Sequence, residues 1–317
     1  MMRFNSHGLK TVYLKDYRAW CLLLSLLAMA ALFVFPTHKR NADIYNLTFV
    51  IDITRSMNAE DYRIAEQPVS RLEFVKLSLR EFVRSLPCQS KVGLGVFTER
   101  RSTILFEPIE VCNGYPELDK SIAALDWRMA WAADSRIAGG LLDAMQLLEA
   151  KETALVFISD GQEAPPLNPR YRTDFSALNG KLKGLILGVG GLQPVPIPKF
   201  DPKGQRIGVY GPDDVPHRAY FGDSDLNPEK IEGYDARNAP FGKHAAVGDE
   251  HMSALRESYL QQLAAETGLN YQRLQNDRPL IDIGQSPALG SQQSIESDRR
   301  YYFALCALGF FLAIFLI

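Results

Sequence analysis

Ile44-Tyr-Asn-Leu-Thr-Phe-Val-Ile51, followed directly by Asp52-Ile-Thr-Arg-Ser56, is the stretch on which the fold depends. The first part is rich in β-branched and aromatic residues, which is typical of a strand buried on both faces of a parallel sheet. Asp52 ends this apolar run and indicates that a polar loop follows. Ligands of such sheets bind at the carboxyl ends of the strands, so the stretch predicts a fold class and the position of a site.

Strands and helices alternate along the rest of the chain. Further short apolar strands are predicted at residues 154–159, 185–189 and 270–274. Helical spacing of apolar residues predicts helices at residues 71–86, 137–151 and 251–268. Residues 91–97 and 102–106 are separated by a short turn and predict an antiparallel hairpin. We therefore expect an α/β fold with a doubly wound, mostly parallel sheet and one antiparallel edge strand.

Two uncharged apolar stretches lie near the ends of the chain. They predict transmembrane helices at residues 19–37 and 301–317, with residues 1–18 as a cytoplasmic segment. A cleavable signal peptide is the alternative for the first stretch, and a buried globular helix is the alternative for the second. Basic residues flank both sides of the spans, so their distribution does not decide which side the middle of the chain faces.

The region between these stretches has the composition of a folded domain. The chain has 317 residues, 35 Lys and Arg, 37 Asp and Glu, and a formal net charge of -2, which argues against general electrostatic binding of nucleic acid. We expect one domain at residues 44–280. It contains a Pro- and Gly-rich insertion at residues 192–248 with little regular structure, and a polar linker at residues 281–300 follows it.

The positions of the four cysteines indicate the cellular compartment of the domain. Cys21 and Cys306 lie in the apolar stretches, whereas Cys88 precedes the first strand of the predicted hairpin and Cys112 follows the second. Both therefore lie at the open end of the hairpin, where a disulfide is geometrically plausible. A bridge implies an oxidising compartment such as the periplasm, and two free thiols are the alternative.

Oxygen-bearing side chains gather at the predicted strand ends. Asp52, Thr54 and Ser56 alternate after one strand, Asp160 ends a neighbouring strand, and Ser135 precedes a helix. Hard cations prefer such ligands, so we expect a divalent cation, Mg²⁺ first, with Ca²⁺ and Mn²⁺ as alternatives. We place both acids at the edge of the sheet, outside its core.

This pattern resembles the metal-ion-dependent adhesion site of von Willebrand factor type A domains, which reads Asp-x-Ser-x-Ser, then Thr, then Asp-Gly. Thr54 and Ser135 depart from it, but each keeps the hydroxyl. The resemblance spans residues 44–276 and implies a non-enzymatic module whose metal binds an Asp or Glu of a protein partner. Arg55 is expected to pair with the same partner carboxylate.

Membrane-anchored bacterial members of that family, the aerotolerance or Bat-type proteins, are similar over Arg55, Ser56-Met57, Ala59, Asp61, Pro68, Arg71-Leu72-Glu73, Lys76, Lys91-Val-Gly-Leu94, Pro196-Ile-Pro198 and Asp201-Pro-Lys-Gly204. Residues 125–134 and 160–166, with the insertion, also resemble the MxaL-type accessory proteins of methanol oxidation clusters. The resemblance implies an inner-membrane protein with a periplasmic domain. It also implies a role in assembly or metal loading of an oxidoreductase such as methanol dehydrogenase, with that enzyme or another accessory protein as partner.

Three other functions are weighed against this one. A structural membrane scaffold would use the metal only to stabilise its loops. A Mg-dependent phosphotransferase would need a second carboxylate two residues after Asp52, where Thr54 stands. A metal hydrolase would be built from His217, His244, Asp249, Glu250 and His251, which lack a recognisable ligand spacing.

Overall fold

The computed structural model describes residues 17–130, 135–164, 172–212, 214, 220–221, 244–245, 250–276, 280 and 289–316. It divides the chain into two units. One unit is residues 44–291, and the other combines residues 1–43 with residues 292–317.

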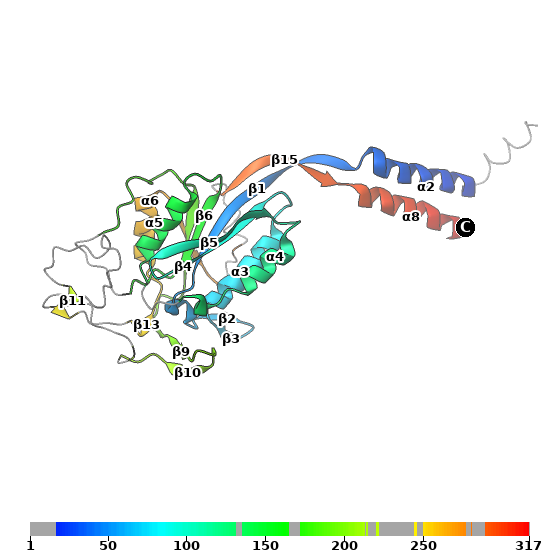
Figure 1. Ribbon diagram of the computed structural model, residues 1–317. Helices are drawn as coiled ribbons and strands as arrows, with labels where there is room; N and C mark the ends of the chain where they lie inside the picture. The colour runs from blue at the N-terminus through cyan, green and yellow to red at the C-terminus, as the bar shows by residue number, and fades with distance from the viewer. Residues whose placement is uncertain are drawn as a thin grey trace, which may run out of the picture. The chain divides into compact units, whose positions relative to one another are not determined.

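A twisted sheet forms the centre of the larger unit (Figure 1). Its main path contains β1 (Thr37–Asp52), β4 (Lys91–Thr98), β5 (Arg101–Glu110), β6 (Ala154–Ser159), β7 (Gly184–Val189) and β14 (Asn270–Leu274), and a seventh strand, β15 (Gly290–Asp298), pairs with β1 outside this path. The order along the path is β14-β7-β6-β1-β4-β5, and every neighbouring pair in it is parallel except β4 and β5. The predicted mostly parallel sheet with one antiparallel edge strand is therefore confirmed.

Helices cover both faces of this sheet, as Figure 1 shows. They are α3 (Arg71–Ser85), α4 (Tyr115–Ala123), α5 (Ile137–Leu148) and α6 (Glu257–Thr267). Leu47, Phe49 and Ile51 of β1 join the core with α3 and α4, and Val50 joins the core with α5 and α6. Successive side chains of a strand point to opposite faces, which is why β1 is mostly apolar from Ile44 to Ile51, where the helices cover it.

Short elements connect these layers. They are the 3₁₀ turns η1 (Arg55–Asn58) and η2 (Trp127–Met129), and the strands β2 (Tyr62–Ile64), β3 (Gln67–Val69), β8 (Val195–Pro196), β9 (Pro198–Phe200), β10 (Arg206–Val209), β11 (Tyr220–Phe221), β12 (His244–Ala245) and β13 (Met252–Ser253). The insertion thus has short strands where little regular structure was expected, and much of residues 192–248 lies outside the described residues. The helix predicted from residue 251 begins at Glu257 instead, because residues 252–253 pair with β8.

The segment predicted as a polar linker is partly a strand. β15 (Gly290–Asp298) pairs with β1, which itself begins at Thr37, before the predicted start at Ile44. Backbone hydrogen bonds carry this pairing, so the polar side chains of Gly290-Ser-Gln-Gln-Ser294 gave no sign of it. Residues 281–288 of the predicted linker lie outside the described residues.

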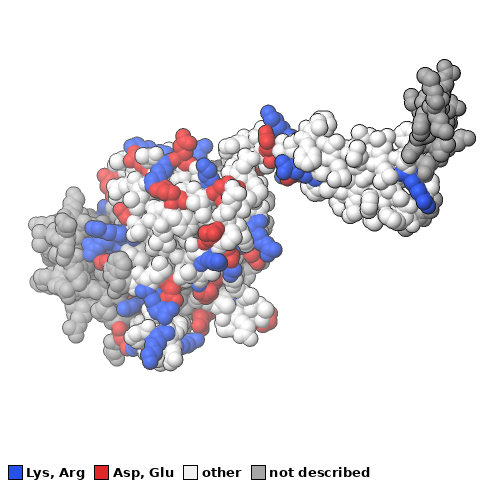
Figure 2. Space-filling view, turned by 45° about the vertical axis from the view of Figure 1, so that its right-hand side comes forward, with Lys and Arg blue, Asp and Glu red and all other residues white. Residues whose placement is uncertain are grey.

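The smaller unit contains two apolar helices, α2 (Tyr17–Val34) and α8 (Arg300–Leu316). They pack together, and the Ser25 hydroxyl donates a hydrogen bond to the carbonyl oxygen of Ala307 at 3.0 Å. Figure 2 shows a surface almost without charged side chains along the two helices, between charged groups near their ends, whereas acidic and basic side chains are mixed over the larger unit. Among the described helices, α2 alone is long and apolar enough to span a membrane, and α8 has 17 residues. The second predicted span stays a prediction.

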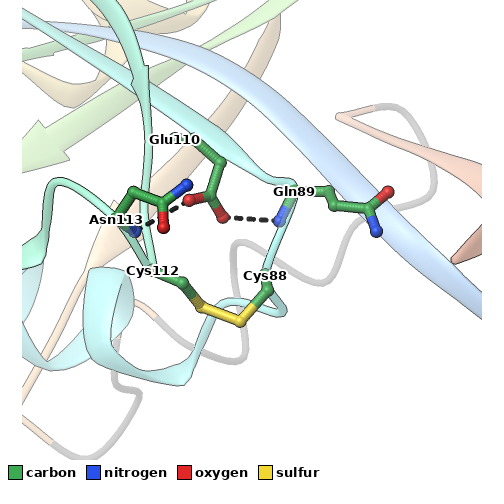
Figure 3. The surroundings of a disulfide bond; sticks show 5 residues. All are labelled: Cys88, Gln89, Glu110, Cys112 and Asn113. Carbon is green, nitrogen blue, oxygen red and sulfur yellow. Dashed lines mark hydrogen bonds between the residues drawn. A yellow bond between two sulfur atoms is a disulfide. The ribbon is translucent and has the colours of Figure 1, made fainter. Parts of the chain in front are cut away.

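A disulfide joins Cys88 and Cys112, with a Cα–Cα distance of 5.2 Å, as predicted from their positions at the open end of the β4–β5 hairpin. Figure 3 shows the carboxylate of Glu110 beside it. This carboxylate accepts the backbone N–H groups of Gln89 at 2.7 Å and Asn113 at 2.8 Å. Cys21 and Cys306 are free.

Replacing both Cys88 and Cys112 by serine should lower the free energy of unfolding by about 3 to 4 kcal/mol, because the bridge restricts a loop of the unfolded chain. Urea unfolding of the full chain in detergent measures this. The double substitution of the free cysteines, Cys21→Ser with Cys306→Ser, is the control and should change little. Alkylation of both Cys88 and Cys112 in freshly isolated, unreduced protein would contradict the bridge.

Candidate functional site

Asp52, Thr54, Ser56 and Asp160 come from loops at the carboxyl ends of the adjacent strands β1 and β6, and Ser135 comes from the segment before α5. Asp52 is the last residue of β1 and lies opposite Phe97 of β4, while Ile51 lies opposite Ile158 of β6. Asp160 follows β6 directly. Ser135 forms backbone bridges with Glu99, after β4, and with Ala164, beyond Asp160. The parallel register therefore brings these loops to one edge of the sheet.

Hydrogen bonds hold the first loop in shape. The backbone N–H and the hydroxyl of Thr54 donate to Oδ1 of Asp52 at 2.9 and 2.7 Å. The Ser159 hydroxyl donates to Oδ2 of the same carboxylate at 2.7 Å. The hydroxyl oxygens of Thr54 and Ser56 are 3.4 Å apart. The alternating polar residues thus lie together, as the sequence predicts, and Asp52, Thr54 and Ser56 are all buried.

Asp160 lies deeper than we expected from the sequence. Its side chain is fully buried, and so is that of Asp52, which corrects the placement of both acids outside the core. Oδ1 of Asp160 accepts the backbone N–H of Gln162 at 2.9 Å, and Oδ2 accepts Arg71 Nη1 at 2.6 Å. Gly161 follows with a φ of 75°, in the region that favours glycine, and the chain turns there.

Arg71 belongs to the sequence similarity with Bat-type proteins, but the sequence did not predict it as a residue of this site. Its guanidinium is fully buried, and Nε and Nη2 donate to the carboxylate of Asp61 while Nη1 donates to Asp160. Burial alone would lower the pKa of Arg71, but the two carboxylates raise that pKa above its ordinary value. The signal in the sequence was the position of Arg71 on the apolar face of α3, four and eight residues before Val75 and Leu79.

Two features of the site fit a cation. The buried hydroxyl oxygen of Ser135 has no hydrogen-bond partner among the described residues, and such a group costs about 1 to 3 kcal/mol. Burial, and then repulsion from Asp160, raises the pKa of Asp52 to about 7, although hydrogen bonds from Thr54 and Ser159 oppose the shift. A cation among these oxygens would offset both costs, so the residues present fit the expected group.

Arg55 lies on η1 beside the site and is half-buried. Its guanidinium carbon lies 5.3 Å from the centre of the Tyr210 ring, next to the β9–β10 hairpin. Lys199 of β9 approaches the same ring at 5.7 Å. A second contact between the hairpin and the site region joins Trp127 and Phe200, with ring centres 5.6 Å apart. The residue expected to meet a partner therefore borders an aromatic and basic surface.

The hydrolase alternative gains no support from the described residues. Among them, the group of His, Cys, Asp and Glu side chains close enough to share an ion is Cys88, Glu110 and Cys112, whose sulfurs are in the disulfide. Glu250 and His251 are not part of it. His217 and Asp249 lie outside the described residues.

In metal-free protein, Asp52→Asn should be more stable than the wild type, and the difference should grow with pH. The unfolded chain loses the Asp52 proton near its ordinary pKa of 3.8, whereas the folded chain holds it to about 7, so wild-type stability falls across that window. Thermal unfolding of both proteins in EDTA at pH 5 and pH 8 measures the difference. An equal change in the unfolding temperature of the two proteins between pH 5 and pH 8 would contradict the prediction.

Residues 47–162 match the family model of the von Willebrand factor type A domain. No curated protein matches the chain. Similar solved structures include an aerotolerance-related membrane protein from Bacteroides fragilis, with 17% identity, 73% of this chain and 91% of that chain covered, and a TM-score of 0.44. Another is BatB from Bacteroides thetaiotaomicron, with 18% identity, 73% and 90% covered, and a TM-score of 0.45. Residues 47–162 therefore belong to a von Willebrand factor type A domain, which confirms the resemblance at the level of this domain.

Proposed function

We propose that this chain is a membrane-anchored, non-enzymatic module that binds a protein partner through a divalent cation. Asp52, Thr54, Ser56, Ser135 and Asp160 would hold the cation, either directly or through water. Mg²⁺ is the first choice, because it accepts carboxylate and hydroxyl oxygens and keeps water ligands, while Ca²⁺ and Mn²⁺ remain alternatives. When bound, the cation would accept a carboxylate oxygen from an Asp or Glu of the partner.

The buried hydroxyl of Ser135, which has no hydrogen-bond partner among the described residues, carries this proposal together with the two buried carboxylates. Domains that bury polar groups normally satisfy them, so this group indicates a ligand. Arg55 supports the same function, because a guanidinium next to the loops can form a second contact with the partner carboxylate. Its stacking on Tyr210 holds it there.

The proposed location is the inner membrane, with the domain in the periplasm. α2 meets the length and apolarity that a membrane span needs, and α8 packs against it as the proposed second span. The disulfide supports the periplasmic side, because such bonds persist in oxidising compartments.

The finer proposal concerns the partner. The resemblance of residues 125–134 and 160–166 to accessory proteins of methanol oxidation clusters favours a periplasmic oxidoreductase such as methanol dehydrogenase, or another accessory protein of its cluster. The module would act in assembly or metal loading of that enzyme.

Asp52→Ala should abolish both Mg²⁺ binding and Mg²⁺-dependent retention of purified methanol dehydrogenase by the immobilised full chain. Asp160→Asn should weaken both and is preferable to Asp160→Ala, which would remove one of the hydrogen-bond acceptors of the buried Arg71. Thr54→Ser keeps the hydroxyl and should be nearly silent, whereas Thr54→Ala should weaken binding. Asp119→Ala removes a carboxylate that pairs with Arg80 away from the site and serves as the control.

Isothermal titration calorimetry and retention assays with Mg²⁺ or EDTA measure these effects. Retention of the enzyme by folded Asp52→Ala protein in EDTA would rule out the metal bridge. Loss of folding in EDTA, without any metal-dependent retention of a partner, would favour the structural scaffold.

A reporter that is active only outside the cytoplasm should be active when inserted at Gly204, in the turn between β9 and β10, and silent when fused after Ile317. This pattern follows if α2 and α8 both span the membrane and the domain lies in the periplasm. The reverse pattern would place the domain in the cytoplasm, while activity at both positions would show that the last helix does not return across the membrane.

A further inference from the structure

Arg71 joins separate parts of the chain. It begins α3, and its partners are the carbonyl oxygen of Ser56 in η1, Asp61 before β2, Asp160 after β6 and Ser253 in β13. Nη1 donates to Asp160 and to the Ser253 hydroxyl at 2.6 Å each, and Nη2 donates to Asp61 at 2.6 Å. Burying an arginine destabilises the fold unless carboxylates pair with its guanidinium. Here the side chain of Asp160 is fully buried and that of Asp61 is nearly so.

This pairing changes the charge at the strand ends. Oδ2 of Asp160 faces Arg71 at 2.6 Å, so the guanidinium cancels much of the charge of that carboxylate. The described contacts of Asp52 are with hydroxyl and backbone N–H groups, which bring no opposite charge to its carboxylate. Asp52, Asp61 and Asp160 together with Arg71 have a formal charge of -2 when all are ionised.

We propose that Arg71 is a positioning residue that sets the charge of the cation site. This inference rests on the proposed function, because it concerns how strongly the site binds its cation. By neutralising Asp160, Arg71 weakens the attraction of the site for a divalent cation and leaves a bound cation with more positive charge toward an incoming carboxylate. Coulombic interactions are strong in such a buried environment, so a single charge has a measurable effect.

A series of variants changes this charge in single steps. Arg71→Met makes the group more negative, and the Kd for Mg²⁺ should fall at least about tenfold. Asp61→Asn keeps an acceptor for Arg71 but removes a negative charge, so the Kd should rise, by a smaller factor because Asp61 is not one of the proposed ligands. Arg71→Lys keeps the charge, and its Kd should stay closer to the wild-type value than that of Arg71→Met.

Calorimetric titration of Mg²⁺ into the metal-free full chain in detergent measures these constants, and near-ultraviolet circular dichroism checks the fold. Arg80→Met is the matched control, because it removes an arginine that pairs with Asp119 on the α3–α4 side of the domain, and its Kd should not change. If Arg71 had a purely structural role, Arg71→Met would raise the Kd for Mg²⁺ instead of lowering it, because a loosened site binds its cation less tightly.

Unchanged or weaker Mg²⁺ binding by folded Arg71→Met protein would overturn the inference while the proposed function stands. If Arg71→Met does not fold, the Asp61→Asn variant decides, and tighter or unchanged Mg²⁺ binding by that variant would overturn the inference. A wild-type chain that binds neither Mg²⁺ nor Mn²⁺ would overturn the proposed function and this inference together. Tighter Mg²⁺ binding by Arg71→Met and weaker Mg²⁺ binding by Asp61→Asn would support the inference.

Discussion

The burial of β1 between β4 and β6 is the constraint on which the rest of the larger unit depends. Between Leu47 and Ile51 the strand has a hydrogen-bonded neighbour on both edges and helices over both faces, so its side chains there are apolar except Thr48. The carboxylates of the site lie where the strands end. Parallel pairing then places the ends of β4 and β6 beside the end of β1, and the loops that follow them meet there.

Electrostatics follow from the same burial. Asp52 and Asp160 leave water completely, which is unfavourable for two neighbouring carboxylates. The structure compensates them differently. Asp52 receives hydroxyl and backbone hydrogen bonds, whereas Asp160 receives a buried guanidinium from α3. The charge of Asp160 is therefore partly offset by an ion pair and that of Asp52 is not, although the two acids look equivalent in the sequence motif.

A disulfide and backbone hydrogen bonds stabilise the larger unit at the end of the sheet opposite the site. The bridge between Cys88 and Cys112 closes the open end of the edge hairpin, and the carboxylate of Glu110 holds the backbone around it. The chain enters the sheet through β1 and leaves it through β15, which pairs with β1.

Local pattern was enough to predict the central strands, the order of strands and helices, and the position of the disulfide. Apolar periodicity is a property of neighbouring residues, and the motif residues Asp52 and Asp160 lie at the ends of strands that this periodicity identifies. The sequence did not predict β15 or the late start of α6, because the backbone pairing that forms β15 and shortens α6 does not require apolar side chains. Nor did it predict the partner of Asp160. Only the tertiary structure brings Arg71 to that carboxylate across a separation of 89 residues, because an ion pair depends on distance in space and leaves no periodic signal along the chain.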